Sequence, residues 1–193
     1  MTDSIIDYRT PDGKSPTDTR LLRSPIDFIA EDHLRLRTMC AQMDCLAAEA
    51  RPGARDVVEL CDYMRHELPL LLADEDEDLI PRVLDRAEPD DDLPKLARRL
   101  DDEHGEIERL AATLRGALCR SSGGVALSGA LRKSLCDLAA AVRRHLILEN
   151  AVLLPLARAR LTYRDLCELR HAMLRRRGLH DLFSDWPAGA LVQ

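Results

Sequence analysis

Histidine and glutamate recur at matched positions in two halves of this 193-residue sequence. His145 and Glu149 are four residues apart, so on an α-helix both side chains project from one face. Glu75 lies in a similar segment, and a proline follows each glutamate six residues later, as Pro81 and Pro155. Imidazole nitrogens and carboxylate oxygens that converge inside a helical bundle are suited to holding iron or manganese. The residue types therefore indicate a metal site.

Two further histidines extend the repeated pattern. The segment Glu-Asp-His at 31–33 resembles Asp-Glu-His at 102–104, and similar lengths of chain separate each histidine from its glutamate. Self-similarity of this kind indicates two copies of one helical hairpin. The candidate metal ligands are His33, Glu75, His104, His145 and Glu149.

The apolar neighbours of these residues place them on buried helix faces. His104 lies between Leu100 and Ile107, and the steps of three and four residues are typical of the side of a helix that faces a core. A single histidine in such a stripe is more often a hydrogen-bonded core residue than a ligand. Two carboxylates in an aliphatic core, however, each cost several kcal/mol unless they are paired. A metal ion would provide that pairing, so the repeated set favours the metal site.

The elements that position these residues are predicted to be helices. Aromatic residues make up only 3% of the chain, and Leu, Ala, Arg, Asp and Glu dominate, which favours helix throughout. The spacing predicts helices over 24–50, 54–86, 93–120 and 126–161, the second kinked near Pro69. Thr162 and Asp165 look like the cap of a shorter fifth helix that Gly178 closes.

The predicted fold class is all-α, an up-and-down four-helix bundle of two helical hairpins with a short C-terminal fifth helix. The bundle is expected over 24–161, and the fifth helix, packed on it, over 162–178. Residues 1–23 carry several prolines and glycines and no period, which predicts an irregular N-terminal arm. Residues 179–193 are predicted to be an irregular tail.

Composition and charge limit the kinds of partner that this protein is expected to bind. The formal net charge of -6 gives no basic surface of the kind that binds nucleic acid. No apolar run is long enough for a membrane span or an export signal, so we expect a cytoplasmic protein without a membrane partner. Six cysteines without CxxC spacing are interpreted as small reduced core residues, with a redox-sensing thiol as the less favoured alternative. We interpret the arginines at 175–177 as cations at a helix end, and the acidic run at 74–78 as mostly a solvated face.

Five segments resemble the hemerythrin-like, or HHE cation-binding, family: EDHLRLRTMC, LPLLLADEDEDLIP, DDEHGEIERL, HLILENAVLLPLARARLT and the closing MLRRRG. The likeness covers residues 24–178 and is greatest to bacterial members with an added fifth helix. The family pattern is His, HxxxE, His, HxxxE, which binds a carboxylate-bridged di-iron centre that takes up oxygen or related small molecules. The resemblance implies iron as the cofactor and the five candidates as its ligands.

One position departs from the family pattern. Leu71 lies four residues before Glu75, where the family has histidine, and leucine cannot donate to a metal. His66 could replace it only if the helix is distorted at Pro69, since nine residues separate His66 from Glu75. Asp78 and Glu106 are weaker alternatives as oxygen donors. We therefore expect an asymmetric di-iron site, or a mononuclear one.

Three functions follow. The first is a non-haem iron protein that binds O2, NO or peroxide for sensing, storage or detoxification, with the diatomic ligand or peroxide as its partner. The second is an oxygen- or peroxide-activating iron enzyme, which we rank lower because no substrate-pocket signature is visible. The third is a degenerate, metal-poor bundle that acts as a regulatory or interaction module. The sequence identifies no protein partner.

Overall fold

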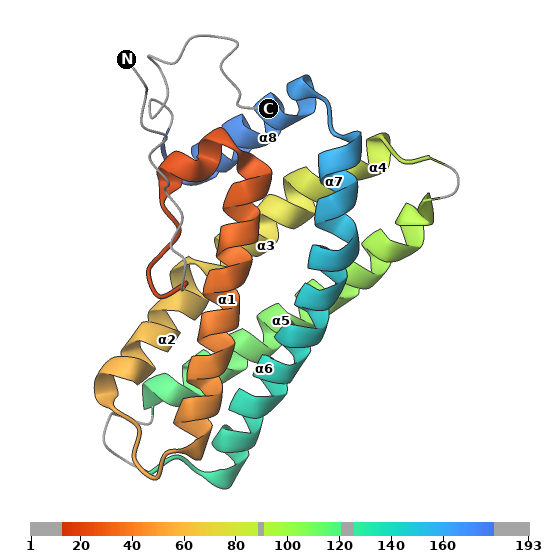
Figure 1. Ribbon diagram of the computed structural model, residues 1–193. Coiled ribbons are helices and arrows are strands. Elements are labelled where there is room, and N and C mark those ends of the chain that lie inside the picture. The colour runs from red at the N-terminus through yellow and green to blue at the C-terminus, as the bar shows by residue number, and fades with distance from the viewer. Residues whose placement is uncertain (1–12, 89–90, 121–125, 180–193) are drawn as a thin grey trace.

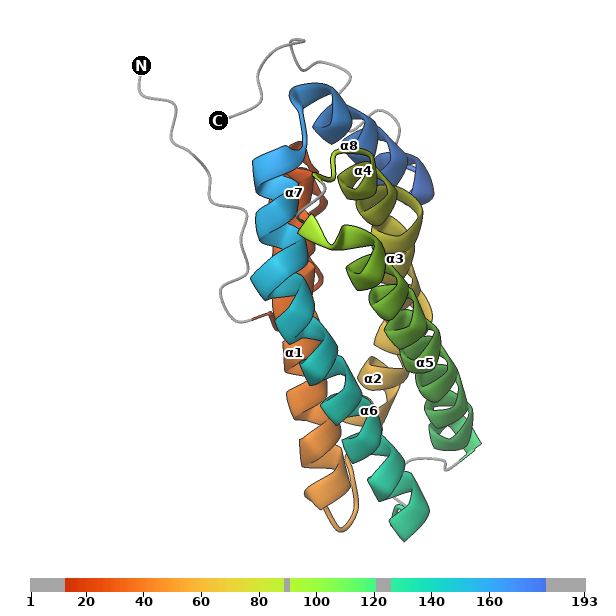
Figure 2. The ribbon, with the colours of Figure 1, turned by 90° about the vertical axis from the view of Figure 1, so that its right-hand side faces the viewer.

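The computed structural model describes residues 13–88, 91–120 and 126–179, and within them every regular element is a helix (Figure 1). This confirms the all-α prediction. The long helices run side by side as a bundle, and both views show α8 across one end of it (Figure 2).

The first hairpin begins with α1 (Pro25–Ala48). Ser24 precedes it, and the Ser24 hydroxyl donates to Asp27 in the first turn at 2.7 Å. Proline fits the first helical position because its missing amide proton would have no partner there. The chain turns before α2 (Ala54–His66), which packs against α1.

The second arm of this hairpin is broken where the sequence predicts a kink. After α2, the short α3 (Leu68–Ala73) begins one residue before Pro69. It leads into a π-helical turn, η2 (Asp74–Leu79), and then into α4 (Ile80–Asp85). The second hairpin consists of α5 (Leu93–Arg120), α6 (Gly129–Leu148), a second π-helical turn η4 (Glu149–Leu153) and α7 (Leu154–Arg160).

The two π-helical turns lie at matching places in the repeat. The amide of Ile80 donates to the carbonyl of Glu75, and the amide of Leu154 donates to the carbonyl of Glu149, five residues back in each case. A proline comes next in both arms, and it cannot donate to the carbonyl four residues before it. Each glutamate therefore lies in a widened turn, a feature often found at functional sites.

The core between the helices is aliphatic and continuous. Leucines from every long helix are almost fully buried, among them Leu36, Leu60, Leu100 and Leu135, and Leu153 of the η4 turn is buried with them. The amphipathic stripes predicted from sequence thus meet along the bundle axis. This core surrounds the polar residues described below.

The fifth helix, α8 (Tyr163–Arg176), begins with the predicted cap. The Thr162 hydroxyl accepts from the amide of Asp165, and the Asp165 carboxylate accepts from the amide of Thr162 at 2.9 Å. Before α1, a 3-10 turn η1 (Thr19–Arg23) buries Leu22 completely. None of the described helices has the length and apolar character that crossing a membrane requires, and the cytoplasmic location stays a prediction.

Candidate metal centre

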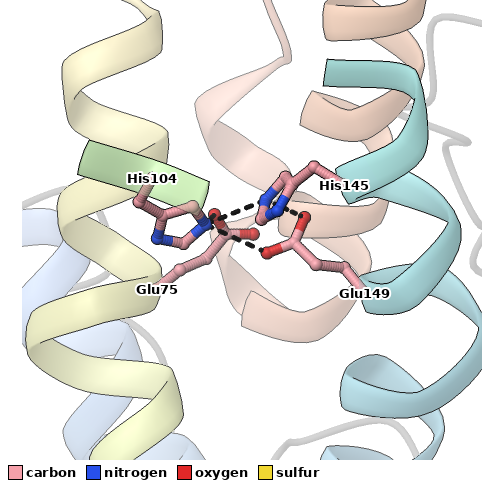
Figure 3. A group of neighbouring side chains, drawn as sticks. All are labelled: Glu75, His104, His145 and Glu149. Carbon is pink, nitrogen blue, oxygen red and sulfur yellow. Dashed lines mark hydrogen bonds and ion pairs between the residues drawn. The ribbon is translucent and has the colours of Figure 1, made fainter. Parts of the chain in front are cut away.

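Four of the five candidate ligands converge in the middle of the bundle. Glu75 comes from η2, His104 from α5, His145 from α6 and Glu149 from η4, and Figure 3 shows their side chains pointing toward one another. One potential ligand atom from each residue lies within 4.8 Å of the others. All four residues are at most 1% exposed, so both hairpins contribute to one buried polar cluster.

The fifth candidate, His33 on α1, lies beside the same two carboxylates. Its Nε2 is 2.8 Å from Glu75 Oε1 and 3.4 Å from Glu149 Oε2. The other oxygens, Glu75 Oε2 and Glu149 Oε1, face His104 Nε2 at 3.7 Å and 3.4 Å. Each carboxylate therefore lies between His33 on one side and the pair His104 and His145 on the other.

Each imidazole has an outer partner on its second nitrogen. His104 Nδ1 is 2.6 Å from Asp76, and His145 Nδ1 is 3.0 Å from Glu103. A carboxylate only accepts hydrogen bonds when ionised, so each of these nitrogens carries the proton. In the neutral tautomer, Nε2 then presents its lone pair to the centre of the cluster.

His33 is held in the same way by an amide. Its Nδ1 is 3.3 Å from Asn150 Oδ1. Asn150 donates its amide nitrogen to the Leu146 carbonyl at 2.7 Å, which leaves its oxygen free to accept from His33. All three histidines thus direct Nε2 inward.

This arrangement fits a bound cation. His104 Nε2 and His145 Nε2 are only 2.9 Å apart, and two lone pairs at that distance repel unless a proton or a metal ion lies between them. Glu75 Oε2 and Glu149 Oε1 are buried and have no hydrogen-bond partner. Buried polar atoms of this kind normally have a partner, so the cluster has the donor atoms and the unmet charge that a metal site needs.

The pKa values of these groups reflect the same excess of negative charge. Burial lowers the pKa of His33, but Glu149 and Glu75 outweigh burial and raise it to about 9. Burial likewise lowers the pKa of His104, while Asp76 and Glu149 raise it to about 10. Burial raises the pKa of Glu75, and the adjacent Glu149 adds to this effect. Without a metal, protons on the histidines balance the carboxylates.

The position that departs from the family pattern contributes no donor. Leu71 is 2% exposed and belongs to the apolar core. The alternatives considered from sequence do not join the cluster: His66 and Glu106 are exposed. Asp78 is buried, but it pairs with Arg82 at 3.0 Å and with Arg176 at 2.6 Å. The first hairpin therefore supplies one histidine to the cluster, and the second supplies two.

The interpretation of the acidic run as a solvated face is wrong. Asp74, Glu75 and Asp78 are buried, and only Glu77 of the run is exposed. Glu75 lies in the cluster, and its neighbour Asp76 holds His104. The wide π-helical turn at 74–79 is what directs most of these consecutive carboxylates inward.

Two arginines at the end of α8 form ion pairs with the other carboxylates of this acidic run. Arg177 binds Asp74 at 2.6 Å and lies over the ring of Phe28 at 4.8 Å from its centroid. Arg176 contacts Asp74 as well, and it binds Glu77 at 2.8 Å. The arginines do end a helix as predicted, but two of them also fasten α8 to the turn that carries Glu75.

A signal for the outer partners is present in the repeat, although it was not part of the predicted site. Asp76 directly follows Glu75, and Asn150 directly follows Glu149, so they occupy equivalent places in the repeat. Each holds a histidine of the opposite hairpin. Glu103 belongs to the quoted segment 102–104, yet only the contact with His145 on the neighbouring helix gives it a role.

A four-helix bundle with a buried histidine and carboxylate cluster defines a class of cation-binding helical domains. A family model described as the hemerythrin HHE cation binding domain matches residues 24–159. The match spans most of the chain, so the chain belongs to the hemerythrin HHE cation-binding family, as the resemblance indicated. Neither the curated proteins nor the solved structures compared with the chain include a significant match.

Proposed function

We propose that this protein binds non-haem iron in the buried cluster and uses it to bind O2, NO or peroxide for sensing, storage or detoxification. The 2.9 Å approach of His104 Nε2 to His145 Nε2 carries the proposal, since both rings give their Nδ1 proton to a carboxylate. Two inward-facing Nε2 atoms at this distance share a proton when no metal is bound, and iron would take the place of that proton.

The cluster supports a site with two unequal halves. His104 and His145 would hold one iron together with an oxygen from each glutamate, and this half is the four-residue group within 4.8 Å. His33 would hold a second iron together with Glu75 and Glu149, with fewer protein donors. Iron prefers more ligands than either half provides, so bound iron would supply open coordination positions for a small ligand.

The chain's own residues prepare the site for this role. Asp76 and Glu103 fix the tautomers of His104 and His145, and such outer contacts make the imidazole a stronger donor. The two glutamates come from π-helical turns, which bring both carboxylates to the same level of the bundle. The aliphatic core around them keeps bulk water away.

Metal content tests the proposal directly. Protein produced with iron supplementation should contain iron by elemental analysis, and His104→Ala should lose most of it, because His104 faces both glutamates. His171→Ala is the matched control, since His171 is exposed on α8. Iron-free wild-type protein that gains no thermal stability from added Fe(II) would contradict the proposal.

The degenerate, metal-poor module is the second candidate, and buried Leu71 favours it. The repeat offers a way to decide. Asp32 directly precedes His33 as Glu103 precedes His104, and Glu103 holds His145 on the next helix. By this equivalence we expect the Asp32 carboxylate to accept a hydrogen bond from a histidine introduced at position 71.

We therefore predict that Leu71→His raises the iron bound per chain toward two, because it completes the weaker half of the site, as measured by elemental analysis. Leu71→Asn introduces a polar side chain without a strong iron donor and serves as the control. Iron binding by Leu71→His alone, with none in the wild type, would instead establish the degenerate module. Two irons per chain in both proteins would show that His33 and the glutamates already hold the second ion, and one iron per chain in both would contradict the prediction.

A further inference from the structure

The cysteines are distributed differently from the prediction of small core residues. Only Cys40 and Cys61 are buried, whereas Cys45, Cys119 and Cys136 are exposed. The prediction was therefore wrong for most of them. Two of the six lie side by side on helices of different hairpins.

Cys61 on α2 and Cys119 on α5 form this pair. Their sulfur atoms are 3.9 Å apart. A disulfide bond has a sulfur separation of about 2.05 Å, so the sulfurs need to approach by less than about 2 Å. Cys119 lies in the last turn of α5, which ends at Arg120. Helix ends fray at little cost, so the last turn can make this small movement.

We propose that Cys61 and Cys119 form a reversible disulfide when the protein meets a peroxide, which makes the pair an oxidation site separate from the metal centre. The proposal does not require bound iron. Among the described residues, no other pair of cysteine sulfurs is in contact.

Exposure assigns the two sulfurs different tasks. Cys119 is open to solvent, so its sulfur is the one that peroxide can reach. Cys61 is 9% exposed, and burial and the neighbouring Cys119 raise its pKa to about 12. Cys61 is therefore the less accessible sulfur, and it remains a thiol until Cys119 has been oxidised.

The reaction balances with hydrogen peroxide as the oxidant. The Cys119 sulfur attacks one peroxide oxygen, so an S–O bond forms, the O–O bond breaks, and the departing hydroxide takes the thiol proton to become water. The Cys61 sulfur then attacks the Cys119 sulfur, so the S–S bond forms, the S–O bond breaks, and a second water leaves with the Cys61 proton. The two sulfurs lose two electrons, and the peroxide gains them.

The experiment treats the full chain with graded hydrogen peroxide, alkylates the remaining thiols and measures the intact mass. We expect the loss of two alkylatable thiols per chain at low peroxide, their recovery with dithiothreitol, and a non-reduced peptide that links Cys61 to Cys119. Cys136→Ala is the control and should behave like the wild type, because Cys136 is exposed on a different helix.

Two variants separate the roles of the sulfurs. In Cys61→Ala, Cys119 should accumulate as sulfenic acid that dimedone traps, and in Cys119→Ala, Cys61 should stay reduced. Circular dichroism checks that both variants remain folded. Oxidation of Cys119 no faster than that of Cys45 or Cys136 would overturn the proposal. A linked peptide that joins two chains instead of Cys61 and Cys119 would also overturn it.

Discussion

Each histidine of the cluster directs one ring nitrogen toward the cluster centre and the other away from it. The outward contacts go to Asp76, Glu103 and Asn150, and they decide which nitrogen keeps its proton. A metal site requires the tautomer of each histidine to be fixed before the metal binds, because a free imidazole populates both tautomers. At the scale of single residues, the outer partners are therefore as important as the candidate ligands.

Glu103 allows a direct test of this idea. We expect Glu103→Ala to weaken metal affinity about 10- to 100-fold, because His145 loses the acceptor that fixes its ring. Glu106→Ala on the same helix is the control, since Glu106 is exposed and should leave affinity unchanged. Competition with a chelator of known affinity measures both. Equal affinities would show that Glu103 does not orient His145.

At the scale of elements, α8 does more than cover the end of the bundle. Its two last arginines reach the π-helical turn η2, where Asp74 is completely buried directly before Glu75. Arg177 also approaches Asp32, the residue before His33, at 3.9 Å. The fifth helix thus supports both segments that bring the first hairpin's residues to the cluster.

Arg177→Ala should therefore destabilise the protein. The variant leaves part of the Asp74 charge buried without its partner, while Arg176 still contacts it, so we expect a loss of about 3 kcal/mol in the free energy of unfolding. Arg175→Ala, an exposed neighbour on the same helix, should change it by less than about 0.5 kcal/mol. Urea unfolding of both variants measures the difference. Similar losses of unfolding free energy in Arg177→Ala and Arg175→Ala would contradict a stabilising role of α8 at the η2 turn.

The start of α8 gives a pH-dependent prediction. Hydrogen bonds from Arg86, and secondarily from Thr162, hold the pKa of Asp165 well below its ordinary value of 3.8. A lowered pKa in the folded state means that the stabilisation is present above pH 3.8 and is lost as the pH falls below it. The Arg86 side chain is 44% exposed, so solvent screens the pair.

Asp165→Asn isolates this contribution, because an asparagine oxygen can still accept from the amide of Thr162. The wild type should exceed the variant by about 1 kcal/mol in unfolding free energy at pH 7. The difference should shrink toward zero as the pH falls below the ordinary aspartate value. A difference that stays constant with pH would show that the charge of Asp165 has no part in it.

At the scale of the whole molecule, the cluster connects the two hairpins. The candidate ligands come from all four arms of the bundle, and the unfolded chain cannot bring them together. A metal that binds only the folded state stabilises it by mass action, by about 2.7 kcal/mol when its free concentration is 100 times Kd.

Thermal unfolding at increasing Fe(II) under anaerobic conditions should therefore give a rising Tm in the wild type. His104→Ala should show a Tm that does not depend on the metal. A wild-type Tm that is equally insensitive would indicate that the hairpins are held together by apolar packing alone.

Much of the fold and of the candidate set follows from the sequence alone. The helices, the two-hairpin repeat and the capped fifth helix follow from local spacing, because apolar periodicity and caps act within a few residues of chain. The five candidates emerged from the same repeat, and the structure places them side by side. Their role as metal ligands stays a prediction.

Only the tertiary structure decided what lies opposite each side chain. It showed that Asp74 is buried against Arg176 and Arg177, that Glu103 holds His145, and that Cys61 touches Cys119. These contacts join residues far apart in the chain, so no local period records them. The sequence by itself therefore determined the leucine-rich buried faces of the helices and which residues repeat. The packing of one hairpin on the other, and of α8 on both, determined the burial of the acidic run, the exposure of most cysteines, and the partner of each buried charge.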